Sequence, residues 1–323
     1  MHIFKSIALI TSIILISLVL LLAAVNTVFH IIYRDFYKRA EPSFTIPGLG
    51  DGFVPQGVTE VGESILVSGY MTKDRPSRIY AVKNGKSSYA EILNADGTPY
   101  KGHGGGIDTY GDRAFLAGDG ALEILSLSDV LDGDGKATVK GSFDPGLDPA
   151  WCTVSGECIF MGSFAYNKVD NYKPEEKETF TTPTGEKNVS LIKCFALDST
   201  APNGINPTPM YAISAGEKVQ GLAFADENTL ILSTSYGLTS SLLIFHSTDK
   251  MKDNAGEYIT DDGKIIPLYY LDSHSKTREV KAPPMSEELL VKDGYVYIMN
   301  ESASDKYIFG KLLGQSKAYR YKI

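Results

Sequence analysis

Residues 217–237 read EKVQGLAFADENTLILSTSYG, and they repeat a phrase that the chain has already used at 54–70, VPQGVTEVGESILVSGY. Each stretch contains Gln-Gly, an apolar run, a short acidic break, a second apolar run, and then small residues and a tyrosine. Apolar runs of four to seven residues bounded by Gly, Asp, Asn and Ser predict β-strands joined by turns. The repetition therefore indicates a chain built from similar strand-rich units.

Beyond residue 41 such units can be aligned along the whole chain. They span 55–95, 103–143, 148–215, 219–272 and 288–323, and each contains four expected strands except the last, which stops one strand short. Four-stranded sheets that repeat every ~40–50 residues are typical of a β-propeller. We therefore expect an all-β, five-bladed β-propeller, with six blades as the alternative if the long third or fourth unit contains another blade.

The strand missing from the last unit has to come from elsewhere, because a propeller must close its ring. The segment PSFTIPGLG, residues 42–50, is the natural candidate for this outer strand. In the fourth unit the expected outer strand is IIPLYYLD, residues 265–272. The ring is thus predicted to be closed by a strand from the N-terminal side of the domain.

Residues 7–32 contain no Asp, Glu, Lys or Arg, and ~20 apolar residues suffice to cross a bilayer. A cleavable signal peptide would have a shorter apolar region and a cleavage site of small residues, and Ala23-Ala24 is the one weak candidate for such a site. We expect an uncleaved transmembrane signal anchor with a juxtamembrane stalk over 1–40, followed by a propeller domain over 41–323.

The orientation of this span is ambiguous from charge alone. Lys5 precedes the span and Arg34, Lys38 and Arg39 follow it, which by the positive-inside rule would place the domain in the cytoplasm. A lone N-terminal span before a domain of short strands is instead typical of an exported protein. We expect a single-pass protein of the cell membrane with an extracellular propeller.

The domain is acidic. Taking Lys5, Arg34, Asp35, Lys38 and Arg39 out of the whole-chain balance of −8 leaves −11. Nucleic-acid binding requires clustered cations, so we expect no nucleic-acid partner. Neutral, cationic or metal-bridged partners fit this charge better.

Three features admit a plain structural interpretation. The cysteines, Cys152, Cys158 and Cys194, predict free thiols, although the first two could face each other across a hairpin. DVLDGDGKAT, residues 129–138, lacks the ligand spacing of an EF-hand and predicts a turn. The insertion at 167–188 is either a solvated excursion or a binding element.

In a propeller the residues that open each first strand and the loops after each second strand lie on the same face, around the central channel. Polar, aromatic and acidic groups that converge on one cleft suit a ligand site. The candidate ligand-binding residues are Gln56, Tyr70, Arg78, His103, Asp119, Trp151, Gln220, Tyr236, Glu287 and Glu301. Gln56 and Gln220 could equally bond the backbone of a neighbouring blade.

A catalytic interpretation uses His103, Glu287 and Glu301. His103 titrates near neutral pH and could act as a general base, or it could be a structural histidine that bonds across blades. Glu287 and Glu301 could perform acid and base chemistry on a sugar or hold Ca²⁺, while a buried carboxylate paired with Arg78 is the structural alternative. One of Glu287 and Glu288 should face the channel and the other the sheet, because strand side chains alternate. No metal ligands can be assigned, and Ca²⁺ is the one cofactor considered.

The motifs PQGV, HGGGID, VQGLAF with STSYG, and PPMSEELL with ESAS resemble a family of exported Gram-positive β-propeller proteins. The resemblance covers residue 50 to the C-terminus and implies a secreted or surface propeller without implying an activity. PQGV and VQGL also resemble, more loosely, the first strands of NHL-type and gluconolactonase-like propellers. Glutamine stands where those enzymes carry metal ligands, so their metal site is not transferred to this chain.

The sequence thus favours a membrane-anchored extracellular propeller that binds a small molecule, a glycan or a protein partner at its channel mouth. The alternative is a surface hydrolase or lyase that uses His103 with the channel carboxylates, with Ca²⁺ as a candidate assistant.

Overall fold

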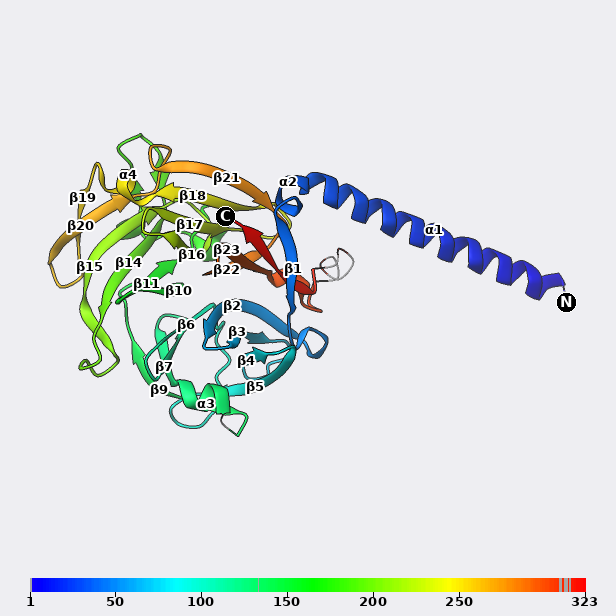
Figure 1. Ribbon diagram of the computed structural model, residues 1–323, viewed down its shortest axis with the longest axis horizontal. Helices are drawn as coiled ribbons and strands as arrows, with labels where there is room; N and C mark the ends of the chain where they lie inside the picture. Colours follow the sequence, from blue (N-terminus) through cyan, green and yellow to red (C-terminus); the bar gives the residue numbers. More distant parts are fainter. Residues whose placement is uncertain (1, 133, 308–309, 311–312, 314) are drawn as a thin grey trace.

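A long N-terminal helix projects from a domain of β-strands in the computed structural model, which describes residues 2–132, 134–307, 310, 313 and 315–323 (Figure 1). Helix α1 spans His2–Ile32 and is followed by the single turn α2, Arg34–Tyr37. Within α1, Leu9–Ile32 has a mean hydropathy of 2.6, and its most apolar window is not buried against the domain. The predicted apolar N-terminal helix is confirmed.

The domain is an all-β propeller whose strands pair in consecutive antiparallel groups of four. The first group is β2 (Phe53–Val61), β3 (Ser64–Met71), β4 (Arg78–Lys83) and β5 (Lys86–Leu93). The next is β6 (Gly106–Tyr110), β7 (Arg113–Ala117), β8 (Leu122–Ser126) and β9 (Lys136–Phe143). It is followed by β10 (Pro149–Ser155), β11 (Cys158–Ser163), β14 (Ser190–Leu197) and β15 (Ile205–Ala215).

The remaining strands complete the ring. One group is β16 (Val219–Asp226), β17 (Thr229–Thr234), β18 (Ser241–Ser247) and β21 (Lys276–Ala282). The last is β22 (Ser286–Lys292), β23 (Tyr295–Asn300), β24 (Lys317–Lys322) and β1 (Ala40–Thr45). The first strands contact one another in the order β2, β6, β10, β16, β22 and back to β2. They therefore form the innermost layer, as Figure 1 shows.

The N-terminal outer strand begins two residues earlier and ends five residues earlier than expected. β1 covers Ala40–Thr45 rather than 42–50, and it pairs antiparallel with β24. Pro47 cannot donate to a strand ladder, and Gly48, at φ 72°, turns the chain into a short 3₁₀ helix, η1 (Leu49–Asp51). The prediction that an N-terminal segment completes the last group is still confirmed by the pairing.

The expected outer strand of the fourth unit is wrong. β20 (Ile265–Tyr270) pairs in parallel with β15 of the preceding group and antiparallel with β19 (Gly256–Ile259), and β21 takes the outer position beside β18. Both segments have the alternating pattern of an outer strand, so local sequence could not separate them. Pairing with β15 of the neighbouring sheet decides the position of β20 and leaves the place beside β18 to β21.

The predicted turn at 129–138 contains a helical segment. α3 spans Leu127–Asp132, and Gly135, at φ 83°, leads into β9, while residue 133 lies outside the described part of the chain. The thiols of Cys152, Cys158 and Cys194 are all free, as expected.

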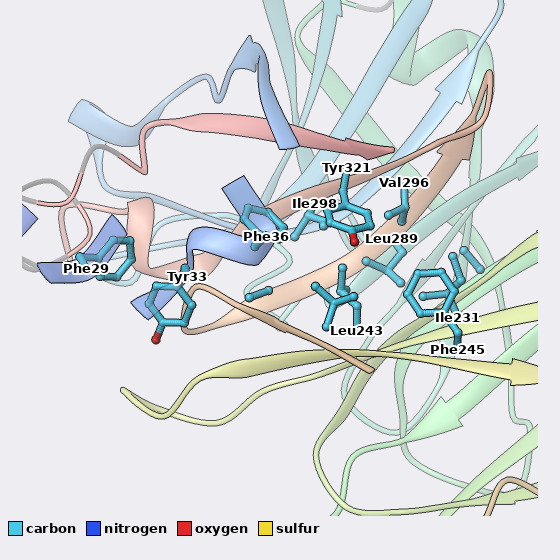
Figure 2. Packing of buried hydrophobic residues seen from close by; sticks show 13 residues of the cluster. Phe29, Tyr33, Phe36, Ile231, Leu243, Phe245, Leu289, Val296, Ile298 and Tyr321 are labelled. Carbon is cyan, nitrogen blue, oxygen red and sulfur yellow. The ribbon is translucent and has the colours of Figure 1, made fainter. Parts of the chain in front are cut away.

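The end of α1 and the turn α2 are packed on the propeller. Phe29, Tyr33 and Phe36 are buried in one hydrophobic cluster with strand residues that include Leu243 and Tyr321 (Figure 2). The rings of Phe36 and Tyr321 stack with centroids 5.6 Å apart. The Tyr33 hydroxyl lies 3.1 Å from Ser240 Oγ, within hydrogen-bonding distance. The segment expected to form a stalk is therefore held by the domain.

Candidate functional site

The register of four of the five first strands shifts by one residue at an equivalent place in the ring, whereas β6 pairs with β7 without a shift. In β2 the shift falls between Pro55 and Gly57, in β10 between Pro149 and Trp151, and in β16 between Val219 and Gly221. In β22 it falls between Ser286 and Leu289. Such bulges insert one extra residue and re-aim its side chain. The extra residues include both glutamines of the repeated Gln-Gly phrase.

These bulges build the floor of a cavity of about 720 Å³. Four first strands contribute Gln56, Ala150 with Pro149, Gln220 and Glu287 to the lining, and Gly105 lines it from the position just before β6. The wall comes from the ends of the second strands and the loops that follow them: Tyr70, Asp119, Phe164, Tyr236 and Glu301. Because Gly105, just before β6, and Ala150, in the adjacent β10, are small, this side of the floor leaves space for a ligand.

The glycine after each bulged glutamine is required by close packing of neighbouring strands. A Cβ on Gly57 would lie 2.7 Å from the Ile107 nitrogen, and a Cβ on Gly221 would lie 2.7 Å from the Glu288 Cα. Real side chains do not approach backbone this closely. The Gln-Gly phrase thus combines a side chain that faces the cavity with a residue that lets the next first strand approach.

Most of the predicted site residues meet in this cavity. The candidates that line it are Gln56, Tyr70, His103, Asp119, Gln220, Tyr236, Glu287 and Glu301. Trp151 does not line it, because the bulge puts Ala150 at the floor and turns the next side chain into the core, where Trp151 is fully buried. Arg78 starts a third strand away from the axis and pairs with Asp51 (2.7 Å) and Glu91 (3.1 Å). The idea of a channel carboxylate paired with Arg78 is therefore not supported.

Glu287 and Glu301 are the acidic centre of the cavity. Glu287 is 2% exposed and lines the cavity. Burial raises the pKa of Glu287 well above its ordinary value, and the charges of Glu301 and Glu288 raise it further. Glu301 Oε1 accepts hydrogen bonds from the hydroxyls of Tyr70 and Tyr307, both at 2.8 Å. The environment thus favours a neutral, protonated Glu287 beside a carboxylate held by two phenols.

Glu288 lies beneath the floor, where its carboxyl group bonds the backbone of other first strands. Its Oε2 accepts the backbone N–H groups of Val58 (2.8 Å) in β2 and Ile107 (3.0 Å) in β6. Burial raises the pKa of Glu288 well above its ordinary value. The expectation that one of the pair would face the channel and the other the sheet is met only for Glu287, which lines the cavity. Glu288 also turns into the ring, where it bonds β2 and β6, because the register shift between Ser286 and Leu289 interrupts the alternation of side chains.

His103 stands at the cavity wall without a catalytic geometry. Its ring packs on Tyr70, with centroids 4.8 Å apart, and no described hydrogen bond joins it to Glu287, Glu301 or Asp119. Burial by the surrounding wall lowers the pKa of His103, although the charges of Glu301 and Asp119 oppose the shift. The His103 ring, packed against Tyr70, is better placed to contact a ligand than to exchange a proton with a channel carboxylate.

The insertion at 167–188 supplies another wall of the cavity. It contains the 3₁₀ turns η2 (Asp170–Tyr172) and η3 (Glu176–Glu178) and the short hairpin β12 (Phe180–Thr181) and β13 (Lys187–Asn188). Five of its residues line the cavity: Asn171, Tyr172, Lys173, Glu175 and Glu178. The position of the insertion therefore favours a binding element over a solvated excursion.

Several cavity residues were not predicted. Asp148, Phe164, Tyr172, Glu178 and Tyr307 line the cavity but were not among the candidates. Phe164 follows its second strand as Tyr236 follows its own, so alignment of the repeats could have found it. The insertion has no counterpart in the other units, and nothing in its sequence shows that it folds back over the channel.

No metal centre is apparent in the described part of the chain. Within residues 2–132, 134–307, 310, 313 and 315–323, no group of three or more His, Cys, Asp or Glu residues has the arrangement to hold a metal ion. Ca²⁺ assistance therefore remains a sequence-based prediction without a ligand set.

No family model and no curated protein sequence matches the chain. Solved structures with similar folds include the PQQ-bound aldose sugar dehydrogenase from Streptomyces coelicolor, with 13% identity, 87% of this chain and 96% of that chain covered, and a TM-score of 0.45. Others are the GH43_1 enzyme from Xanthomonas citri complexed with xylose (8% identity, 89% and 91% covered, TM-score 0.43) and a chain of the nidogen/laminin complex (13% identity, 77% and 73% covered, TM-score 0.39). These likenesses concern the fold at low TM-scores, and the resemblance to an exported Gram-positive family rests on the quoted motifs alone.

Proposed function

We propose that this chain is a membrane-anchored, five-bladed β-propeller that binds a short neutral saccharide in its central cavity. Each antiparallel group of four strands is taken as one blade, and β19 with β20 as an extension of the third. The anchor is α1, and the domain lies outside the cell. The floor of the cavity carries amide and carboxyl groups, and its walls are rich in tyrosine. Both features suit a sugar ring with many hydroxyl groups.

The observation that carries this proposal is the chemistry of the floor. Gln56 and Gln220 present amides, which both donate and accept hydrogen bonds, and Glu287 presents a carboxyl whose burial favours the neutral form. Sugar hydroxyls also donate and accept. A few well-placed polar groups among aromatic walls are typical of small-molecule sites, and the volume lies in the usual range of about 300–1,000 Å³.

The charges of the wall argue against an anionic ligand. Asp119, Asp148, Glu175 and Glu301 face the cavity, against the cations Lys173 and Lys306. Lys306 Nζ already donates a hydrogen bond to the Tyr70 hydroxyl. Nucleotides and uronic acids would meet a net negative wall, so neutral saccharides are favoured.

A thermal-shift screen of the full chain in detergent tests this proposal. The panel contains neutral hexoses and pentoses, their trisaccharides, uronic acids and organic amines. We expect a neutral saccharide to raise Tm, since a ligand at 100-fold its Kd stabilises by about 2.7 kcal/mol. The shift should disappear in the double variant Gln56→Ala, Gln220→Ala. A shift only with acids or amines, or one retained in the double variant, would contradict the proposal.

A hydrolase or lyase acting on the same saccharide is the second candidate. One observation favours it: a carboxyl kept neutral by burial, Glu287, lies beside Glu301, and pairs of carboxyl groups with different environments perform acid and base roles in glycoside cleavage. The test is product analysis after long incubation with the saccharides that bind. Turnover that Glu287→Gln abolishes, with binding retained, would establish the enzyme; intact saccharide would leave a binding protein.

A further inference from the structure

The insertion at 167–188 is bonded to the rest of the propeller at two places. Lys177 Nζ donates to the carbonyl of Gly146 and lies 3.6 Å from Asp261. At the other end, the Thr184 hydroxyl donates to Asp272 (2.9 Å). A segment tied down in this way presents its side chains in fixed positions.

One residue of the insertion, Tyr172, belongs to an aromatic panel, which we define as Phe164, Tyr172 and Tyr236. Phe164 and Tyr172 meet edge to face with centroids 5.1 Å apart, and the rings of Tyr172 and Tyr236 are 5.9 Å apart. Tyr166 supports the panel from a position 4.8 Å from Tyr236. All three panel residues line the cavity.

The panel is exposed although it is well braced. Tyr172 is 43% exposed, while its ring is held by two neighbours. An exposed cluster of aromatic rings in a cavity marks a binding surface. The panel comes from the end of β11, the insertion and the loop after β17, whereas the hydrogen-bonding floor comes from the bulges of the first strands. Floor and panel are thus two chemically different surfaces of one cavity.

We propose that the panel is a second saccharide subsite, on which a further sugar ring stacks while the first ring is hydrogen-bonded by the floor. The physiological ligand is accordingly an oligosaccharide, and the insertion determines its length. This inference rests on the proposed function. Stacking uses the apolar C–H face of a sugar ring and needs no charge, which agrees with a panel that carries phenol and phenyl groups only.

Isothermal titration of the full chain in detergent micelles tests the subsite. The probes are glucose, galactose, mannose, xylose and arabinose with the corresponding homotrisaccharides. We expect the wild type to bind one trisaccharide at least tenfold more tightly than its monosaccharide. Tyr172→Ala should remove most of this difference and leave the monosaccharide Kd within about twofold, whereas Tyr172→Phe should restore it.

Tyr89→Ala is the matched control, because Tyr89 is 44% exposed and lies outside the cavity. It should leave both affinities unchanged. If Tyr172→Ala weakens both ligands equally, or neither, the subsite is refuted while saccharide binding stands. If the wild type binds none of the ten saccharides, the proposed function fails, and the subsite fails with it.

Discussion

The residue that organises the cavity is the extra residue of each first-strand bulge. Gln56 and Gln220 owe their direction to these bulges, and Gly57 and Gly221 make the bulges compatible with the neighbouring strand. Each Gln-Gly pair therefore repeats the same local geometry. Packing constrains the glycine, and the glutamine is available to a ligand.

Gly221→Ala should destabilise the ring. The new Cβ would lie 2.7 Å from the Glu288 Cα, which belongs to backbone and cannot rotate away. We expect a loss of about 1–3 kcal/mol in the free energy of unfolding, as overpacked positions show. Denaturant unfolding followed by the fluorescence of Trp151, the single tryptophan, measures it. Gly216→Ala is the control, because no atom lies within 4 Å of its Cβ; equal stability of the two variants would contradict the account.

Glu287→Gln should stabilise the protein at neutral pH. At pH values between the ordinary pKa of glutamate and the raised pKa of Glu287, this side chain is ionised in the unfolded chain and protonated in the folded protein. The free energy of unfolding therefore falls as pH rises through this range. Glutamine does not titrate, so the variant does not lose stability in this way. Each unit of difference in pKa corresponds to about 1.4 kcal/mol.

We expect Tm of the Glu287→Gln variant to exceed that of the wild type by about 2–4 °C at pH 7.5, the effect of roughly 1 kcal/mol. The difference should vanish towards pH 4, where both states are protonated. Scanning calorimetry at the two pH values measures it. Glu63→Gln is the control, since Glu63 is exposed and its hydrogen bond with Lys83 lowers its pKa. A pH-independent difference would refute the assigned cause.

At the scale of elements, the sequence predicts strands well and their partners less well. Apolar runs between turn residues located the strands, and the repeat located the ring. Trp151 was misplaced because the register shift at Ala150 cannot be seen in sequence, and one residue of register reverses the side that a side chain faces. Residues 265–272 were misassigned because β20 pairs with a strand more than 50 residues away.

The junction between α1 and the propeller is an element held by packing. Phe36 is 1% exposed in the cluster that Figure 2 shows. Phe36→Ala should reduce the free energy of unfolding by about 3–5 kcal/mol, as expected for a buried phenylalanine. It should also speed trypsin cleavage after the exposed Arg34, Lys38 and Arg39, because the segment that carries them is no longer held by packing. Unfolding and limited proteolysis in nanodiscs measure both effects. Leu18→Ala, on the exposed face of α1, is the control, and unchanged trypsin resistance of Phe36→Ala would contradict a packed junction.

At the scale of the whole molecule, the ring brings groups from every unit to one cavity, and in the proposed topology α1 anchors the ring to the membrane. The proposed topology is testable because Cys152 and Cys194 are buried and Cys158 is partly covered. Gly50 is exposed, and no atom lies within 4 Å of its Cβ position. Gly50→Cys should react with a membrane-impermeant maleimide on intact cells, and the wild type should not. Labelling only after lysis would place the propeller inside.

The structure of the full chain with a bound trisaccharide tests the central claim most directly. We predict density for one sugar ring within hydrogen-bonding distance of Gln56, Gln220 and Glu287, and for a second ring stacked on Tyr172 or Tyr236. Saccharide density outside the cavity, or an empty cavity at a concentration that saturates binding in solution, would contradict the account.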